Sequence, residues 1–142
     1  FRILKKVVKI LMTVIVLDMQ SVLYARLLER AMLQELDNHQ IIISKTPNLT
    51  KDICEIHKPR VVIMEVTGYS PWMLNDRLEL SNQIKKNNPE CKIIFMTDGD
   101  ADKKLAEQIV KAKQSGHADS ILFTSVSENF LAAVITSLEN QE

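Results

Sequence analysis

The stretch VVIMEVTGYSPW, from Val61 to Trp72, decides the fold because it opens with four apolar residues and then places a carboxylate at Glu65. This short run has the β-branched composition of a strand that is buried on both faces. Ser70 and Pro71 then follow the pattern of a helix N-cap with proline at the first helical position. The stretch therefore predicts a strand, a loop and a helix that begins near Pro71.

The same alternation of short β-branched runs and longer amphipathic segments covers the rest of the chain. Further strands are predicted at 13–17, 39–44, 91–97 and 120–124, and helices at about 21–36, 48–57, 71–87, 100–114 and 127–139. Strands that alternate with helices form parallel sheets through right-handed crossovers. We therefore predict an α/β fold, a doubly wound, flavodoxin-like sheet of five parallel strands with five helices in a three-layer sandwich.

The size and composition of the chain favour one globular domain without nucleic-acid binding. Its 142 residues suffice for a core, and its 46% hydrophobic and 25% charged residues are ordinary proportions. The net charge is zero, but the basic residues of 1–11 leave the remainder with a net charge of −4. A nucleic-acid-binding body normally shows the opposite balance, so we expect no direct nucleic-acid binding by this domain.

Residues 1–11, FRILKKVVKIL, combine four basic residues with an apolar stripe. One interpretation is a basic amphipathic extension that binds a membrane surface or a partner groove. The other, which we favour, is a cloning remnant or upstream extension, with native sequence beginning at Met12. The apolar run that follows ends at Asp18 and is too short to cross a bilayer, so we expect no membrane span.

Several common chemistries lack their sequence motifs. Cys54 and Cys91 belong to no C-x-x-C pair, which predicts a reduced, cytoplasmic protein without a metal or redox motif. His39, His57 and His117 have no ligand spacing, and no glycine-rich phosphate loop follows any strand. We therefore expect no nucleotide cofactor and no enzyme activity.

Ligands of doubly wound sheets bind at the carboxyl ends of the strands. The residues at these positions are Asp18, Ser44, Glu65, Thr97 and Thr124. Beyond the fourth strand, Asp98, Asp100 and Asp102 form an acidic cluster. We interpret the cluster as the favourable first turn of the next helix, with cation recruitment as the alternative.

The strand ends VLDMQS, VVIME and IIFMT, with GHADSILFTSVS before the last helix, resemble a CheY-like receiver domain of bacterial two-component response regulators. The resemblance covers residues 12–142. It implies a phosphorelay domain that transfers a phosphoryl group from a histidine kinase to its own aspartate. It also implies Mg²⁺ held by acidic residues, and a hydroxyl and a lysine that bind the phosphoryl oxygens.

The chain departs from this pattern at most of the implied positions. Asp18 matches one acid of the usual pair, but Met19 stands at the other, and a thioether is a poor Mg²⁺ ligand. Glu65 replaces the aspartate, and Thr124 stands where the resemblance implies lysine; Thr97 matches the hydroxyl. Asp18 and Glu65 are the remaining candidate metal ligands, and a longer carboxylate misplaces an in-line attack.

We therefore predict a pseudo-receiver that acts in signal transduction or transcription regulation through a protein partner or an effector domain, independently of phosphorylation. Tyr69, Trp72 and Ile121 are candidates for its interaction surface, and a homodimer is expected through the last strand and its flanking helices. Glu65 is either a permanent charge that biases the conformation or a solvated strand-end acid. Two alternatives are a weakly active receiver that phosphorylates Glu65 or Asp98 with Mg²⁺, and a small-molecule-binding flavodoxin-like domain.

Overall fold

The computed structural model describes residues 12–98, 103–124 and 128–140. Its five parallel strands form one sheet in the order β2-β1-β3-β4-β5. The strands are β1 (Thr13–Asp18), β2 (His39–Ser44), β3 (Val61–Glu65), β4 (Lys92–Thr97) and β5 (Ser120–Phe123). The helices are α2 (Val22–Glu35), α3 (Pro47–His57), α4 (Leu74–Asn87), α5 (Lys103–Gln114) and α6 (Glu128–Glu139).

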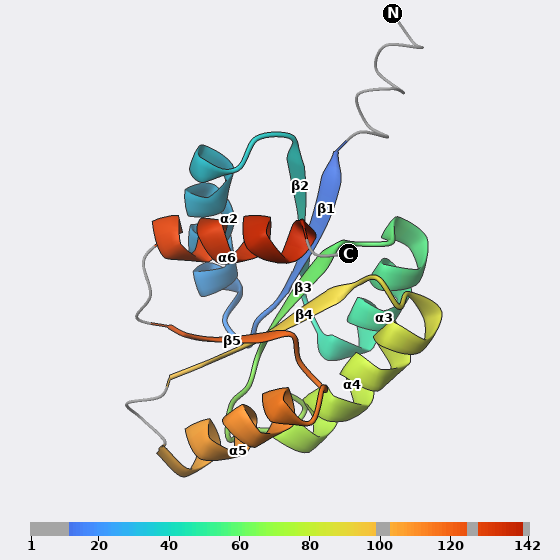
Figure 1. The fold of residues 1–142 in the computed structure, drawn as a ribbon, viewed down its shortest axis with the longest axis vertical. Helices are drawn as coiled ribbons and strands as arrows, with labels where there is room; N and C mark the ends of the chain where they lie inside the picture. Colours follow the sequence, from blue (N-terminus) through green and yellow to red (C-terminus); the bar gives the residue numbers. More distant parts are fainter. Residues whose placement is uncertain (1–11, 99–102, 125–127, 141–142) are drawn as a thin grey trace, which may run out of the picture.

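The sheet separates two layers of helices. Helices α2 and α6 cover one face, and α3, α4 and α5 cover the other (Figure 1). The side chains of successive β1 residues point to opposite faces of the sheet, as they do in any β-strand. Ile15 and Leu17 join the core cluster that contains Met32 of α2, whereas Val16 joins the cluster that contains Ile84 of α4. The predicted doubly wound, three-layer sandwich is confirmed.

Strand order reverses at β1, which pairs with β2 on one side and with β3 on the other. This reversal is the topological switch point, where the carboxyl ends of β1 and β3 leave room for a site between the loops that follow them. Asp18 ends β1 and Glu65 ends β3. The topology therefore brings these two acids to the position at which such folds bind ligands.

The expected start of the third predicted helix, at Pro71, is wrong. Helix α4 begins at Leu74, and the Ser70–Pro71 peptide bond is cis. The N–H of Trp72 donates to the carbonyl of Tyr69 at 2.8 Å, and the N–H of Thr67 donates to the carbonyl of Trp72 at 2.9 Å. These bonds close a turn over 67–72, so the backbone groups that a helix would need are already used there.

The remaining predicted bounds lie within a few residues of the observed ones. Ser21, the expected first residue of the first predicted helix, is the N-cap of α2, and its hydroxyl accepts the N–H of Tyr24 at 3.2 Å. Helix α3 ends at His57, and its C-cap Lys58 has left-handed backbone angles (φ 48°) before Pro59. Strand β5 ends at Phe123, so Thr124 lies in the turn that follows. Ser127, the expected cap of the last helix, is outside the described residues.

Candidate functional site

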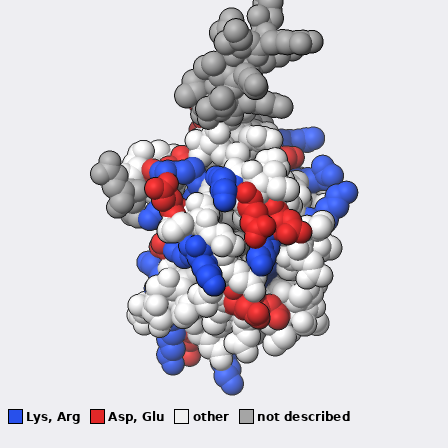
Figure 2. All heavy atoms as spheres, turned by 90° about the vertical axis from the view of Figure 1, so that its right-hand side faces the viewer, with Lys and Arg blue, Asp and Glu red and all other residues white. Residues whose placement is uncertain are grey.

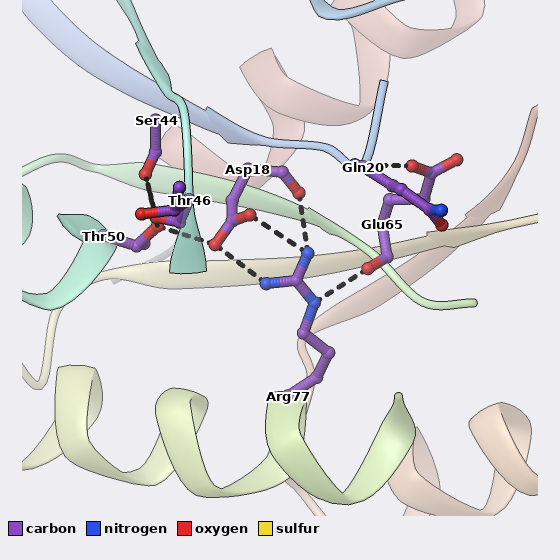
Figure 3. Close-up of polar contacts among 7 residues, drawn as sticks. All are labelled: Asp18, Gln20, Ser44, Thr46, Thr50, Glu65 and Arg77. Atoms are coloured by element: carbon purple, nitrogen blue, oxygen red, sulfur yellow. Dashed lines mark hydrogen bonds and ion pairs between the residues drawn. The ribbon is translucent and has the colours of Figure 1, made fainter. Parts of the chain in front are cut away.

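The carboxylate of Asp18 lies in the interior at the end of β1, and the guanidinium of Arg77 binds it from α4. Both side chains are fully buried. Nη1 of Arg77 donates to Oδ2 of Asp18 at 2.8 Å, and Nη2 donates to Oδ1 at 3.1 Å (Figure 3). Two such parallel bonds form the fork geometry in which Arg–carboxylate pairs are strongest. The strand-end acid is therefore neutralised from within the chain.

The same guanidinium also holds the backbone at the ends of two strands. Nη2 of Arg77 donates to the carbonyl of Asp18 at 3.0 Å, and Nε donates to the carbonyl of Glu65 at 2.8 Å. Each strand-end carbonyl thus gains a charge-assisted partner. Figure 3 shows the guanidinium of Arg77 lying between Asp18 and the main chain of Glu65. The switch point of the sheet is therefore closed by a cation of the protein itself.

A chain of hydroxyl groups completes the surroundings of Asp18. Oγ1 of Thr50, on α3, donates to Oδ2 of Asp18 at 2.6 Å. Oγ of Ser44 lies 2.6 Å from Oγ1 of Thr50 and 2.8 Å from the carbonyl oxygen of Thr46, and its single proton is donated to one of these two acceptors. Ser44 and Thr50 are buried. Buried polar groups that all have partners form a rigid network, so Asp18 is fixed from both sides.

The carboxylate of Glu65 turns away from this network. Its Oε1 accepts the N–H of Gln20 at 2.8 Å, which ties the end of β3 to the loop after β1. The side chain is half-buried, and in Figure 3 it points toward Gln20 while the main-chain oxygen of Glu65 points toward Arg77. The structure thus brings Asp18 and Glu65 to one place, with a guanidinium between the first carboxylate and the backbone of the second residue.

Met19 belongs to the hydrophobic core. Its side chain is 1% exposed and packs in the cluster that contains Ile15 and Leu17, on the α2 and α6 face of the sheet. A carboxylate at this position would stand in an apolar environment. The methionine therefore contributes packing to the core at a position where the receiver resemblance implies a metal ligand.

The two threonines at the far strand ends are placed near each other. Thr97 is buried at the end of β4, and its carbonyl accepts the N–H of Thr124 at 3.0 Å. The carbonyl of Thr124 in turn accepts the hydroxyl of Tyr24 at 3.3 Å, and that hydroxyl also lies 3.9 Å from the sulfur of Met96. Tyr24 therefore links α2 to the ends of β4 and β5, a contact that the sequence reasoning missed.

The candidate surface residues have different surroundings. Tyr69 is 70% exposed in the turn before α4, whereas Trp72 is half-buried and its Nε1 is a buried donor without a partner among the described residues. Ile121 is half-buried and packs against the core cluster of the α3–α5 face. Asp98 is exposed, and Asp100 and Asp102 are outside the described residues. The structure therefore does not gather Tyr69, Trp72 and Ile121 into one exposed patch.

The histidines and cysteines build no metal site in the described part of the chain. No group of three or more His, Cys, Asp or Glu side chains is placed there to hold a metal ion. His39 instead pairs with Glu139, with Nε2 2.8 Å from Oε1. Cys54 and Cys91 are free and buried. Burial raises the pKa of each thiol to about 12, and the charge of Asp18 adds to the rise at Cys54.

The residues at the switch point do not fit Mg²⁺. The oxygens of Asp18 are engaged by Arg77 and Thr50. Mg²⁺ requires a near-octahedral shell of oxygen ligands, which usually includes several waters. A guanidinium in direct contact with the same carboxylate also repels a second cation.

Comparison with solved structures identifies the fold as the receiver fold. A response regulator from Thermotoga maritima matches at 18% identity and a TM-score of 0.70, over 92% of this chain and 100% of that one. A DNA-binding response regulator of the LuxR family from Staphylococcus aureus matches at 18% identity and a TM-score of 0.74, over 91% and 100% of the two chains. An orphan response regulator of H. pylori matches at 14% identity and 0.70, over 90% and 97%.

At these low identities the likeness concerns the fold, which is the CheY-like receiver fold that the strand-end pattern predicts. No protein-family model matches the sequence, and no curated protein matches it. In the described residues, no helix is both long and apolar enough to cross a membrane. The division between residues 1–11 and the domain at 12–142 stays a prediction.

Proposed function

We propose that this chain is an atypical receiver domain that acts in signal transduction by protein contacts, without phosphorylation and without turnover. The observation that carries the proposal is the buried guanidinium of Arg77 between the carboxylate of Asp18 and the carbonyl of Glu65. A receiver needs a mobile divalent cation at this place to neutralise phosphoryl oxygens. Here the cation is a side chain that cannot be deprotonated and cannot leave.

The other residues that differ from the receiver pattern at this site also oppose phosphorylation. Met19 is a core residue, Thr124 supplies no positive charge, and the Glu65 carboxylate is hydrogen-bonded to the loop after β1. A phosphoryl group brought to Glu65 would find a threonine, Thr124, where the receiver resemblance implies a lysine, and the residues at Asp18 do not fit Mg²⁺. Loss of preorganised electrostatic stabilisation costs orders of magnitude in rate.

The surface supports a protein as the partner. On the side of the molecule that carries α3 and α4, basic and acidic side chains of the described residues are interspersed, and neither sign dominates (Figure 2). Binding to a nucleic acid depends instead on clustered Lys and Arg against phosphates. Two free, buried cysteines fit a reducing, cytoplasmic setting. The partner is an effector domain or another signalling protein, and Tyr69 at 70% exposure is the strongest candidate contact in the turn before α4.

The homodimer expected at β5 and its flanking helices stays a prediction. Among the described residues, Phe123 and Val110 are the exposed large apolar side chains there, at 38% and 37% exposure. The two interpretations of Glu65 also stay open. Glu65→Gln separates them, because a changed partner affinity would indicate a permanent charge that sets the conformation, and an unchanged affinity would indicate a solvated acid.

The experiment that tests the proposal is the intact mass of the protein after incubation with acetyl phosphate and Mg²⁺. The expected result is no phosphoryl adduct on the wild-type protein, with an ordinary receiver domain labelled in parallel. An adduct that disappears in Glu65→Gln or Asp98→Asn would show that the chain is a weakly active receiver and would overturn the proposal. Asp76→Asn, which changes a carboxylate on α4, is the matched control for nonspecific labelling.

A further inference from the structure

Strand β2 is an edge of the sheet with an uncharged central run, and no described strand pairs with its outer side. It is one of two edge strands, and with six residues it is longer than β5, which has four. Short length, charges, proline and bulges are the usual protections of an edge against pairing with another chain. Between Gln40 and Ser44 the strand has no charge and no proline, and its register with β1 is continuous. The β2 edge is therefore less protected against pairing with another chain than the β5 edge.

The free hydrogen-bonding groups of this edge belong to alternate residues. The N–H of Thr13 donates to the carbonyl of Asn38 at 2.9 Å, and Thr13 is paired with His39. In a parallel ladder this arrangement directs the N–H and C=O groups of even-numbered β2 residues toward β1 and those of odd-numbered residues away from it. The backbone groups of Ile41 and Ile43 therefore point outward from the sheet.

Helix α3 adds exposed apolar side chains beside the edge. One flank of α3, which carries Lys51 and Glu55, lines a narrow space against α4. The helical period places Leu49 and Ile56 away from that flank. Leu49 is 47% exposed and Ile56 is 75% exposed, and α3 contacts β2. The outer side of α3 therefore extends the apolar surface of the β2 edge on one face of the sheet.

Helix α2 also has exposed apolar side chains beside the β2 edge, on the other face of the sheet. Tyr24 marks the flank of α2 that faces the middle of the sheet, because its hydroxyl donates to the backbone carbonyl that follows β5. Val22 and Leu33, at 36% and 49% exposure, lie on the opposite flank, and α2 contacts β2. Arg26 and Glu29 share that flank, so it carries charges of both signs.

We propose that β2 is a homodimer interface, in which it pairs antiparallel with β2 of a second copy about a two-fold axis near Ile41. A two-fold interface must be self-complementary, because the same patch is used on both subunits. The run from Gln40 to Ser44 meets this condition because it carries no charge. The neighbouring flank of α2 carries both a positive and a negative side chain, so two copies would not repel each other through charges of one sign. Pairing would satisfy the outward N–H and C=O groups of Ile41 and Ile43 in both copies and cover Leu49 and Ile56.

This interface differs from the one expected at β5 and does not depend on the proposed function. The first test is sedimentation equilibrium of the full chain over a wide range of concentrations. Ile56→Lys places a positive charge on the exposed outer side of α3 in each copy, and Phe123→Lys is the matched control at the other sheet edge. We expect a dimer of the 16.2 kDa chain whose dissociation constant rises at least tenfold in Ile56→Lys and is unchanged in Phe123→Lys.

A monomer at all concentrations would overturn the proposal. A dimer that Phe123→Lys weakens and Ile56→Lys leaves intact would also overturn it, because the contact would then lie at β5. Circular dichroism of each variant establishes that the fold is kept. Since both substituted side chains are exposed, 75% and 38%, neither substitution removes core packing.

Hydrogen exchange of the edge amides gives a second, independent readout. We expect the N–H groups of Ile41 and Ile43 to exchange quickly in the dilute protein and more slowly as the concentration rises, whereas the N–H of Ile42 is protected throughout. Fast exchange at Ile41 and Ile43 in the dimer would contradict the pairing. Protection of these amides in a monomer would show that another part of the same chain covers the edge, which would equally overturn the proposal.

Discussion

Arg77 and Asp18 form a bidentate ion pair with neither side chain exposed to solvent. The pair joins α4 to the end of β1, and the further bond from Arg77 to the carbonyl of Glu65 joins both to the end of β3. In the proposed account this guanidinium supplies permanently the positive charge that a phosphorylated receiver takes from its metal ion. A charge that never leaves cannot report a signal, so in the proposed account regulation depends on the binding surfaces.

Removing the guanidinium should destabilise the fold strongly. Arg77→Met leaves the Asp18 carboxylate buried without its partner, and breaking a buried ion pair in this way costs about 3–5 kcal/mol. Urea denaturation of the variant measures the loss of unfolding free energy. Arg26→Met, at an exposed position of α2, is the control and should change it by less than about 0.5 kcal/mol.

Replacing both partners together should cost less than the single variant. In Asp18→Leu with Arg77→Met no buried charge is left, and apolar replacement of a buried ion pair is often close to neutral. Equal losses of unfolding free energy in Arg77→Met and in the double variant would contradict this expectation. A loss below about 1 kcal/mol in Arg77→Met would also contradict it.

Met19 should tolerate an apolar change and not an acidic one. Because its side chain is 1% exposed in the core, Met19→Leu should cost less than about 1.5 kcal/mol. Met19→Asp, which restores the acid that the receiver resemblance implies, buries an unpaired charge or forces the carboxyl to remain protonated. Thermal unfolding of the two variants compares them, and an equally stable Met19→Asp protein would show that the position faces the pocket.

The cysteines should react slowly until the protein unfolds. With a pKa of about 12 for Cys54 and Cys91, only about one thiol in 10⁴ is ionised at pH 8, and the thiolate is the reactive form. Labelling with a thiol reagent, followed by intact mass, should show little product in buffer and two labels per chain in denaturant. Rapid labelling of the folded protein would contradict the burial of these side chains.

The same pKa shift makes stability depend on pH in the alkaline range. The ordinary thiol pKa is 9.0, so between that pH and about 12 the unfolded chain loses protons that the folded chain retains. The unfolded state then binds fewer protons, and the free energy of unfolding falls as pH rises. The cysteine contribution is fully present below pH 9 and is lost through this window, which urea denaturation of wild type and Cys54→Ala at several pH values measures.

The strands could be predicted closely because each is a short apolar run with clear limits. HQIIIS and VVIME have the same bounds in the sequence analysis and in the structure. The start of α4 could not be predicted in this way, because the local sequence Ser70–Pro71 is equally compatible with a helix N-terminus and with a tight turn. Only the bonds from Trp72 to Tyr69 and from Thr67 to Trp72, which depend on the folded loop, decide between them.

The acids of the site could be predicted from strand ends, but Arg77 could not be assigned by that route because it comes from a helix. A signal was nevertheless present in α4. Arg77 shares its helical stripe with Leu80, Ser81 and Ile84, all of which are buried, so it stands where the period requires a core residue. An arginine on the apolar stripe of a helix indicates a buried anionic partner, and Asp18 is that partner.

A titration of the protein with Mg²⁺, followed by the amide chemical shifts of Asp18, Gln20 and Glu65, tests the central claim most directly. If Arg77 already occupies the acid pocket, these shifts should not move at Mg²⁺ concentrations that saturate an ordinary receiver domain measured alongside. Saturable shifts at the three amides would show that the metal enters the pocket in the presence of Arg77, and the account of a permanently closed site would then be wrong.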